Sequence, residues 1–300
     1  VIVVDNDSKD DTVSLVQGLE PRIGFPLKTI RSQTNLGFAR ANHLALRYAS
    51  KEYVTALNPD TKPEPAWLGE LAGAMSAHPE VGICASKMMR DDGTGTIDTA
   101  GDGFSTLLKG FKRGEGLPGH RFNRGDYVFG ACGGAALYRR KMIDDIGFFD
   151  EDFFLIHEDT DLSFRAQLSG WRVLYVPGAV VYHRIHGSIG RMSDMAAYFA
   201  LRNIELVRIK NIPALVLARF VHLLAVNALL ELLYFVVKHG KLRAYARAKW
   251  DVLRMLPALL KKRSAIMARR RLSSRDLVRM LTPVHDPMFA GSKLHKMLRD

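Results

Sequence analysis

The stretch FFLIHEDTDLSFRAQLSGW, residues 153–171, contains the sharpest change of character in the chain. An apolar run over 153–156 is followed by three acids within four positions, Glu158, Asp159 and Asp161. After these acids the apolar residues take up a helical spacing. We therefore expect a helix that begins at the acids, directly at the edge of a buried core.

Outward from this stretch, short apolar runs alternate with segments of helical spacing. Strands are expected at residues 1–4, 27–33, 53–61, 81–89 and 172–183. Helices are expected at residues 10–19, 35–50 and 65–79. Residues 91–127 are rich in glycine and polar residues, which favours loops or an irregular hairpin. The alternation predicts an α/β fold with a mostly parallel central sheet.

The overall composition permits a large core and favours anionic partners. The 300 residues are 47% hydrophobic, which suffices for one large domain or two. The formal net charge of +12 favours nucleotides, phospholipid head groups or nucleic acid. Cys84 and Cys132 provide neither a disulfide framework nor a zinc pattern, so a reducing compartment is the default.

The last third of the chain has a different composition. Residues 214–237 are mostly apolar but are interrupted by Arg219 and Glu231, which makes them a marginal spanning helix. Residues 238–275 hold thirteen Lys and Arg and one acid, Asp251. This region is either a helical subdomain with a solvated basic face or a segment that attaches to an anionic membrane surface. Nucleic-acid binding is disfavoured, since few aromatic residues alternate with the basic ones.

Three polar clusters follow expected strands, namely VDNDS (4–8), LNPDT (57–61) and HEDTD (157–161). In open α/β sheets, ligands bind at the carboxyl ends of strands. A carboxylate there can hydrogen-bond a base or ribose, or hold Mg²⁺ or Mn²⁺ beside a diphosphate. His183 ends another strand and can add a nitrogen ligand, with His186 as a competitor. Each cluster also has a structural interpretation, as a turn or as an acidic first turn of a helix.

The motifs VDNDSKDDT, NLGFARANHLAL, LNPDT, FGACGGAALYRR, GFFDEDFFLIHEDTDLSFRAQLSGWRVLYVP and VVYHRIHGSIG stand in this order. Together they resemble the family 2 glycosyltransferases of the GT-A fold, and especially rhamnosyltransferase-like enzymes of bacterial cell-surface polysaccharide synthesis. The resemblance covers residues 1–205 as a catalytic domain and leaves 206–300 as a helical, basic region. Similar enzymes begin with one more strand, so we expect that the sequence opens inside the domain and lacks a first strand and helix.

The resemblance implies a donor pocket. Asp5 would contact the nucleobase or ribose of a dTDP-, UDP- or GDP-sugar. The residues that would shape this turn, support the nucleotide pocket or approach the donor closely are Asn6, Ser8, Asn35, Gly37, Asn42, Asn58, Gly133 and Gly134. The two glycines lack a Cβ and so permit a close approach of backbone to a sugar or diphosphate, although packing explains them equally well.

The resemblance also implies a metal site and a base. The family's Asp-X-Asp motif reads Asn58-Pro59-Asp60 here, so Asp60 would hold Mg²⁺ or Mn²⁺ together with His183. Asp159 would be the general base of an inverting transfer, with Glu158 beside it. Burial and neighbouring acids can raise the pKa of such a base towards neutrality. If the segment is helical, Asp161 and Arg165 form an i,i+4 pair that neutralises one of the acids.

The function expected from this resemblance is transfer of a sugar, with rhamnose as one candidate, to a glycan or lipid-linked acceptor. The expected place is the cytoplasm, on the inner face of the cell membrane, without nucleic acid as a partner. Two alternatives from other classes stay open. One is a catalytically inactive transferase-like scaffold, and the other is a sugar nucleotidyltransferase, although no early glycine-rich phosphate loop is visible.

Overall fold

The computed structural model of the chain describes residues 1–184 and 193–289. Its strands are β1 (Ile2–Asp5), β2 (Lys28–Arg31), β3 (Tyr53–Leu57), β4 (Thr61–Pro63), β5 (Val81–Arg90), β6 (Ile97–Ala100), β7 (Asp102–Phe104), β8 (Gly110–Lys112), β9 (Asp126–Val128), β10 (Ala135–Arg139) and β11 (Arg172–His183). Its helices are α1 (Thr12–Leu19), α2 (Gly37–Leu46), α3 (Trp67–Ala77), α4 (Arg140–Ile146), α5 (Glu158–Leu168), α6 (Asp194–Asn211), α7 (Ala214–Glu231), α8 (Leu242–Ala268) and α9 (Ser274–Met280), with short helical turns η1 (Glu20–Arg22), η2 (Gly119–Arg121) and the π-helical η3 (Leu232–Lys238). His186 lies outside the described residues.

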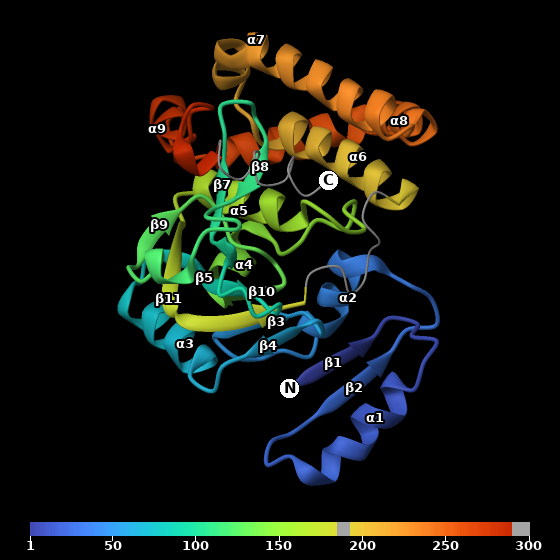
Figure 1. Cartoon of the computed structure of the whole chain (residues 1–300), viewed down its shortest axis with the longest axis vertical. Coiled ribbons are helices and arrows are strands. Elements are labelled where there is room, and N and C mark those ends of the chain that lie inside the picture. Colours follow the sequence, from blue (N-terminus) through green and yellow to red (C-terminus); the bar gives the residue numbers. More distant parts are fainter. Residues whose placement is uncertain (185–192, 290–300) are drawn as a thin grey trace.

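A mixed seven-stranded sheet occupies the centre of the molecule (Figure 1), in the order β3-β10-β5-β11-β4 with β6 and β9 at its sides. Within it only the ladder between β5 and β11 is parallel. The α/β class is therefore confirmed, but the sheet is mixed rather than mostly parallel. The reason is that the chain reaches β10 through short strands instead of a helical crossover, so β10 runs against both neighbours. Strands β1 and β2 form a separate parallel pair.

The two faces of the sheet are covered by different helices. Along β10 the residues alternate, so that Ala135 and Leu137 join the core cluster that contains α3. Ala136 and Tyr138 join the opposite cluster, which contains residues of α4 and α5. This alternation is the two-residue period of a strand that is buried on both faces. As a result α5, which begins at the acids, is packed firmly against the sheet.

Strand β11 is long because it absorbs an irregularity. Its register against β5 shifts between Val176 and Val180, around the sequence Pro177-Gly178. A Cβ on Gly178 would meet the carboxylate of Glu70 at 2.5 Å, so α3 approaches the backbone closely here. Bulges of this kind bend a strand and redirect its end. The redirected end places His183 opposite Thr61 of β4, beside the predicted metal motif.

Helices α6–α9 lie together at one end of the molecule, opposite β1 and β2 (Figure 1). Helix α6 runs from Asp194 to Asn211 and so continues across the boundary expected at residue 205. Its buried residues Lys210 and Asn211 both contact Asp161 of α5, at 2.8 Å each. The C-terminal helices are therefore joined to α5 through a shared buried carboxylate.

Replacing Lys210 by Met tests this connection. Lys210 is 1% exposed and pairs with Asp161, which is fully buried. Removing one partner of a buried ion pair leaves the other charge uncompensated, so we expect a loss of about 3 kcal/mol in the free energy of unfolding. Chemical denaturation followed by circular dichroism would measure it. The matched control is Arg279→Met, which breaks an exposed pair with Asp276 and should cost under about 1 kcal/mol. Equal losses in the two variants would contradict the expectation.

Candidate active site

The acidic end of α5 begins with a strained turn. Ile156 and His157 have φ values of +67° and +72°, in the left-handed region that side chains other than glycine rarely adopt. The side-chain amide of Asn203, on α6, donates to the carbonyls of both Leu155 and Ile156 at 2.7 Å. Strain of this kind persists only where surrounding contacts enforce it, and it concentrates at functional sites. At the start of α5, Asp159 and Thr160 are partly exposed, whereas Glu158 is buried.

Asp159 is the acid of this turn that the backbone holds in place. Its Oδ2 accepts from the amide of Gly133 at 3.0 Å, and its Oδ1 accepts from the amide of Thr160 at 2.6 Å. The Thr160 hydroxyl also donates to Oδ1, at 3.3 Å, so acceptor capacity remains on Oδ2, because each oxygen has two lone pairs. The group is partly exposed, so a substrate hydroxyl can reach it.

The predicted pair of glycines joins this acid to the predicted metal motif. A Cβ on Gly133 would lie 3.3 Å from the Cβ of Asp159, and a Cβ on Gly134 would lie 3.1 Å from the side-chain amide nitrogen of Asn58. The backbone amide of Asn58 donates to the carbonyl of Gly134 at 2.8 Å. Residues 133–134 thus lie between α5 and the turn after β3. The two polar clusters that are a hundred residues apart in sequence lie in one site.

Asp60 and His183 face each other, with 3.7 Å between Asp60 Oδ2 and His183 Nε2. The other carboxylate oxygen of Asp60 is buried and has no hydrogen-bond partner among the described residues. On its far side the ring of His183 contacts Asp98, with 2.9 Å between Nδ1 and Asp98 Oδ2. Asp98 is fully buried and accepts from Lys112 with both oxygens, at 2.7 and 2.8 Å.

These contacts determine the orientation of the His183 ring and the tautomer that a neutral ring adopts. Burial opposes ionisation of Asp98, but Lys112 and the bond to His183 hold the pKa of its carboxyl well below the usual range. An ionised carboxylate only accepts, so the proton of a neutral His183 ring lies on Nδ1 and the lone pair on Nε2 faces Asp60. An outer carboxylate that orients a histidine ligand in this way is a regular feature of metal sites.

The donor set therefore fits a divalent cation, with Asp60 and His183 as the residues that would hold it. One carboxylate and one imidazole suit Mn²⁺ or Mg²⁺ where substrate phosphates supply the remaining ligands. No cluster of three or more potential ligands is present within residues 1–184 and 193–289. When bound, such an ion would supply positive charge against a diphosphate.

The predicted nucleotide residues form a second connected group. Asp5 is buried at the end of β1, and its Oδ1 accepts from the amide of Ser8 at 3.1 Å, which shapes the turn. Asn6 Oδ1 accepts from the Leu36 amide at 2.7 Å, and its Nδ2 donates to Asn35 at 3.1 Å. The turn after β1 and the start of α2 are thus held side by side, as a shared pocket requires.

Two other predicted residues have local roles. Gly37 has φ +74°, and a Cβ there would lie 2.4 Å from the carbonyl of Phe154, which also accepts from the Phe38 amide. Gly37 therefore brings α2 against the loop before α5. Asn42 donates to the carbonyl of Phe38 within its own helix, at 2.9 Å.

Two further acids lie near Asp159. Burial, and then the charge of Asp159, raises the pKa of Glu158 to about 8. The same two causes raise the pKa of Asp102 to about 7. Asp161 is different, because its carboxylate accepts from Arg165 at 2.8 Å in the expected i,i+4 pair as well as from α6. Glu158 and Asp102 are thus shifted towards the protonated form, whereas Asp161 is paired with cations.

Sequence reasoning missed Asp98, Asp102, Lys112 and Asn203. The acids belong to IDTAGDGF (97–104), where carboxylates alternate with small residues, and this was the available signal. Lys112 and Asn203 carried no signal, because their roles depend on partners distant in sequence.

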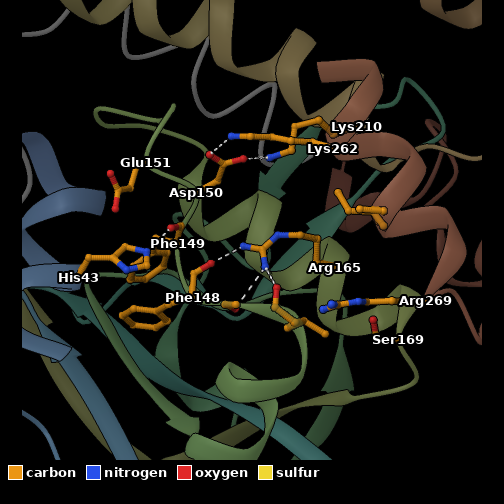
Figure 2. A pocket seen from close by; sticks show the side chains of 14 residues that line it. His43, Phe148, Phe149, Asp150, Glu151, Arg165, Ser169, Lys210, Lys262 and Arg269 are labelled. Carbon is orange, nitrogen blue, oxygen red and sulfur yellow. Dashed lines mark hydrogen bonds and ion pairs between the residues drawn. The ribbon is translucent and has the colours of Figure 1, made fainter. Parts of the chain in front are cut away.

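Figure 2 shows a cavity of about 450 Å³. It is lined from α2, the segment before α5, and α8, and labelled residues include His43, Asp150 and Lys262. Lys262 contacts Asp150 and Asp152 at 2.6 and 2.7 Å, and Lys210 also pairs with Asp150. Both lysines are thus paired with acids of the protein itself. The pairs of Lys262 connect α8 to the segment that precedes α5.

Comparison with known proteins finds similar chains. Residues 1–147 match the family described as glycosyl transferase family 2. The N-acetylglucosaminyl-diphospho-decaprenol L-rhamnosyltransferase of Mycobacterium tuberculosis is 26% identical over 227 residues, which cover 67% of this chain and 70% of that protein. The poly-β-1,6-N-acetyl-D-glucosamine synthase of Staphylococcus aureus is 26% identical over 199 residues, covering 63% of this chain and only 44% of the synthase.

Solved structures support the fold. The mannosyltransferase PcManGT of Pyrobaculum calidifontis, in complex with GDP-Man and Mn²⁺, aligns with a TM-score of 0.53 and 17% identity, over 92% of this chain and 77% of that one. TarS 1–349 of S. aureus, in complex with UDP-GlcNAc, aligns with a TM-score of 0.53 and 18% identity, over 94% and 83%. Residues 1–147 belong to glycosyl transferase family 2, and the chain is a glycosyltransferase of the GT-A fold.

Proposed function

We propose that the chain is an inverting glycosyltransferase that moves a sugar from a nucleoside-diphosphate donor to a glycan or lipid-linked acceptor, with Asp159 as the base. The observation that carries the proposal is the contact through Gly133 and Gly134, which holds Asp159 and the turn of Asp60 in one site. Rhamnose is the first sugar to test, because a relative that covers two thirds of this chain is named a rhamnosyltransferase. dTDP-, UDP- and GDP-sugars are the donors to compare.

The reaction places simple demands on the base. The acceptor oxygen attacks C1 of the sugar, its proton passes to the Asp159 carboxylate, and the bond from C1 to the diphosphate oxygen breaks. The nucleoside diphosphate leaves with the electron pair, and the configuration at C1 inverts. A partly exposed carboxylate that keeps free lone pairs can accept this proton.

Glu158 supports the assignment of roles within the acid pair. Its Oε2 is buried without a hydrogen-bond partner among the described residues, and its pKa of about 8 keeps it mostly protonated at neutral pH. A protonated neighbour adds no second negative charge beside the attacking hydroxyl. Environments that push two carboxylates towards different states are a common way to divide acid and base roles.

Asp5 and its turn would bind the nucleoside, and Asp60 with His183 would hold Mg²⁺ or Mn²⁺. The relatives PcManGT and GalNAc-T7 have Mn²⁺ in their structures, which supports a divalent cation here. The protein's own contribution is to keep the lone pair of His183 directed at Asp60 through Asp98. The donor would then contact both the turn after β1 and the turn after β3.

Asp159→Asn tests the base. An amide cannot accept the proton but occupies the same space, so release of nucleoside diphosphate should fall by about a hundredfold or more, while nucleotide affinity is kept. Turnover would be measured with each donor, Mn²⁺ or Mg²⁺ and a membrane lipid extract, and affinity by calorimetry. The control is Asp144→Asn, an exposed acid of α4 that should turn over normally. Undiminished turnover in Asp159→Asn would refute the base assignment.

Asp98→Asn tests the orientation of the metal ligand. Loss of the carboxylate removes the acceptor that fixes the His183 ring, and we expect a 10–100-fold weaker affinity for Mn²⁺ in the presence of nucleoside diphosphate. Electron paramagnetic resonance of free Mn²⁺ would measure this without relying on turnover. Asp126→Asn, which removes only an exposed contact of Arg113, is the control. Unchanged Mn²⁺ affinity in Asp98→Asn would show that Asp98 has no such role.

Glu158→Gln tests the buried acid through stability. The folded pKa of about 8 lies above the ordinary value of 4.5, so the folded state binds the extra proton between these values. The contribution of Glu158 to stability therefore falls as pH rises through this window. Relative to the unaltered chain, Glu158→Gln should gain stability steadily from pH 5 to pH 8, as measured by urea unfolding. A difference that does not change with pH would contradict the shifted pKa.

A further inference from the structure

Helix α7 exposes a wide apolar side, unlike an ordinary surface helix. Its buried side carries Val216 and Phe220 in the first half of the helix, and the polar residues Asn227 and Glu231, at 3% and 4% exposure, in the second half. Its outer side carries the residues that we call the apolar face, namely Leu215, Val226, Leu229, Leu230, Leu233 and Val237, of which the last two lie in η3. Helices of soluble proteins place such residues towards the core. An apolar side turned outwards needs a covering medium.

The polar side is tied to the body of the protein. Glu231 accepts from Asn227 at 2.7 Å and from Arg208 at 3.3 Å, and Lys249 lies 3.8 Å from its other oxygen. Arg208 is itself buried and donates to the carbonyl of Leu108 at 3.0 Å. Pulling α7 away would leave these charges unpaired, which is costly. The cluster therefore fixes α7 on the protein with its apolar face outwards.

By length and hydropathy, residues 214–238 are able to cross a membrane, and only 17% of the apolar window is buried. Spanning would nevertheless place Glu231 in hydrocarbon and remove it from Arg208. A helix that lies in the plane of the membrane surface needs neither change. It would bury its apolar face by about 5–10 Å at the boundary between head groups and acyl chains.

The neighbouring surface carries the matching charge. Helix α8 exposes Arg243, Arg254 and Lys261, for which no acidic partner is present within the described residues. Trp250 is 56% exposed on the same helix, beneath the guanidinium of Arg254. Tryptophan is favoured at the boundary between lipid and water, and cations are attracted to anionic head groups. Figure 1 shows α7 and α8 together at the end of the molecule opposite β1 and β2.

We propose that the apolar face of α7, with the cations of α8, docks in the plane of a bilayer surface that contains anionic lipid, without crossing it. The one charged side chain exposed within α7 is Arg219, whose length lets it reach the head groups. The inner leaflet of the cell membrane carries such lipid. The inference is independent of the proposed sugar transfer, because its tests measure binding and depth alone.

Co-sedimentation with vesicles tests the apolar face. The chain should bind vesicles of phosphatidylcholine with phosphatidylglycerol, and Leu229→Glu with Leu233→Glu should weaken binding by about tenfold or more. The matched control is Leu15→Glu with Leu19→Glu on α1, at 59% and 50% exposure, which should bind like the unaltered chain. Melting by circular dichroism would verify that each variant is folded. Binding that survives the α7 changes, or an unaltered chain that binds no vesicle, would overturn the proposal.

The cations are tested separately. Changing Arg243, Arg254 and Lys261 together to Gln should weaken binding to the anionic vesicles by at least about tenfold. The affinities for anionic vesicles and for vesicles of pure phosphatidylcholine should then differ less than they do for the unaltered chain. Equal affinity of the triple variant for the anionic vesicles would exclude the electrostatic part of the proposal. A soluble dimer that is dispersed by the α7 changes, seen by sedimentation equilibrium without lipid, would instead assign the apolar face to a second copy.

Spin-label depth distinguishes lying from spanning. Cysteines at Leu215, Val226 and Val237, introduced one at a time with Cys132→Ala, would be labelled on vesicle-bound protein; Cys84 is fully buried. A helix in the surface plane gives similar shallow depths at the three positions. A label at Val226 that lies much deeper than the two others would show that the helix crosses the bilayer and would overturn the proposal.

Discussion

The buried carboxylate of Asp161 is the constraint on which the rest of the structure depends. It has no exposure, and it is balanced by Arg165 on its own helix and by Lys210 and Asn211 on α6. A lone ionised carboxylate in such a position would cost several kcal/mol, so the three partners must be present together. Since Asp161 lies two residues after Asp159, the charge balance of one acid sets the position of the other.

The same interaction extends in two directions. Arg165 also donates to the carbonyls of Ile146 and Phe148, at 2.8 and 2.5 Å, and so fixes the chain that leads into α5. Lys210 reaches Asp150, which Lys262 of α8 shares. Figure 2 shows these groups around the cavity. The C-terminal helices therefore help to hold α5 and Asp159 in place, although their composition suggested a separate region.

The parts that could be predicted are those whose partners lie close in sequence. The Asp161–Arg165 pair follows from an i,i+4 spacing, and the alternation of strands and helices gave the α/β class correctly. Residues 91–127 were expected to be loops or an irregular hairpin, and β6–β9 were not foreseen, because these strands have three or four residues each, too few to show a period. Asp98 and Lys112 lie in this part, so the contacts that orient the His183 ring could not be predicted. Asn203 was equally invisible, since its amide serves carbonyls 47 and 48 residues away.

Composition also left the C-terminal region open, and one residue shows why. The apolar run at 214–237 with a glutamate inside it is compatible with a core helix, a spanning helix and a helix that lies on a surface. The choice depends on which side of the helix Glu231 occupies and on whether a cation meets it. Arg208 meets it from α6, which is the helix that also carries Asn203 and Lys210. Helix α6 thus holds the turn before α5 through Asn203 and fixes α7 through Arg208, so α6 sets the orientation of the apolar face relative to the start of α5.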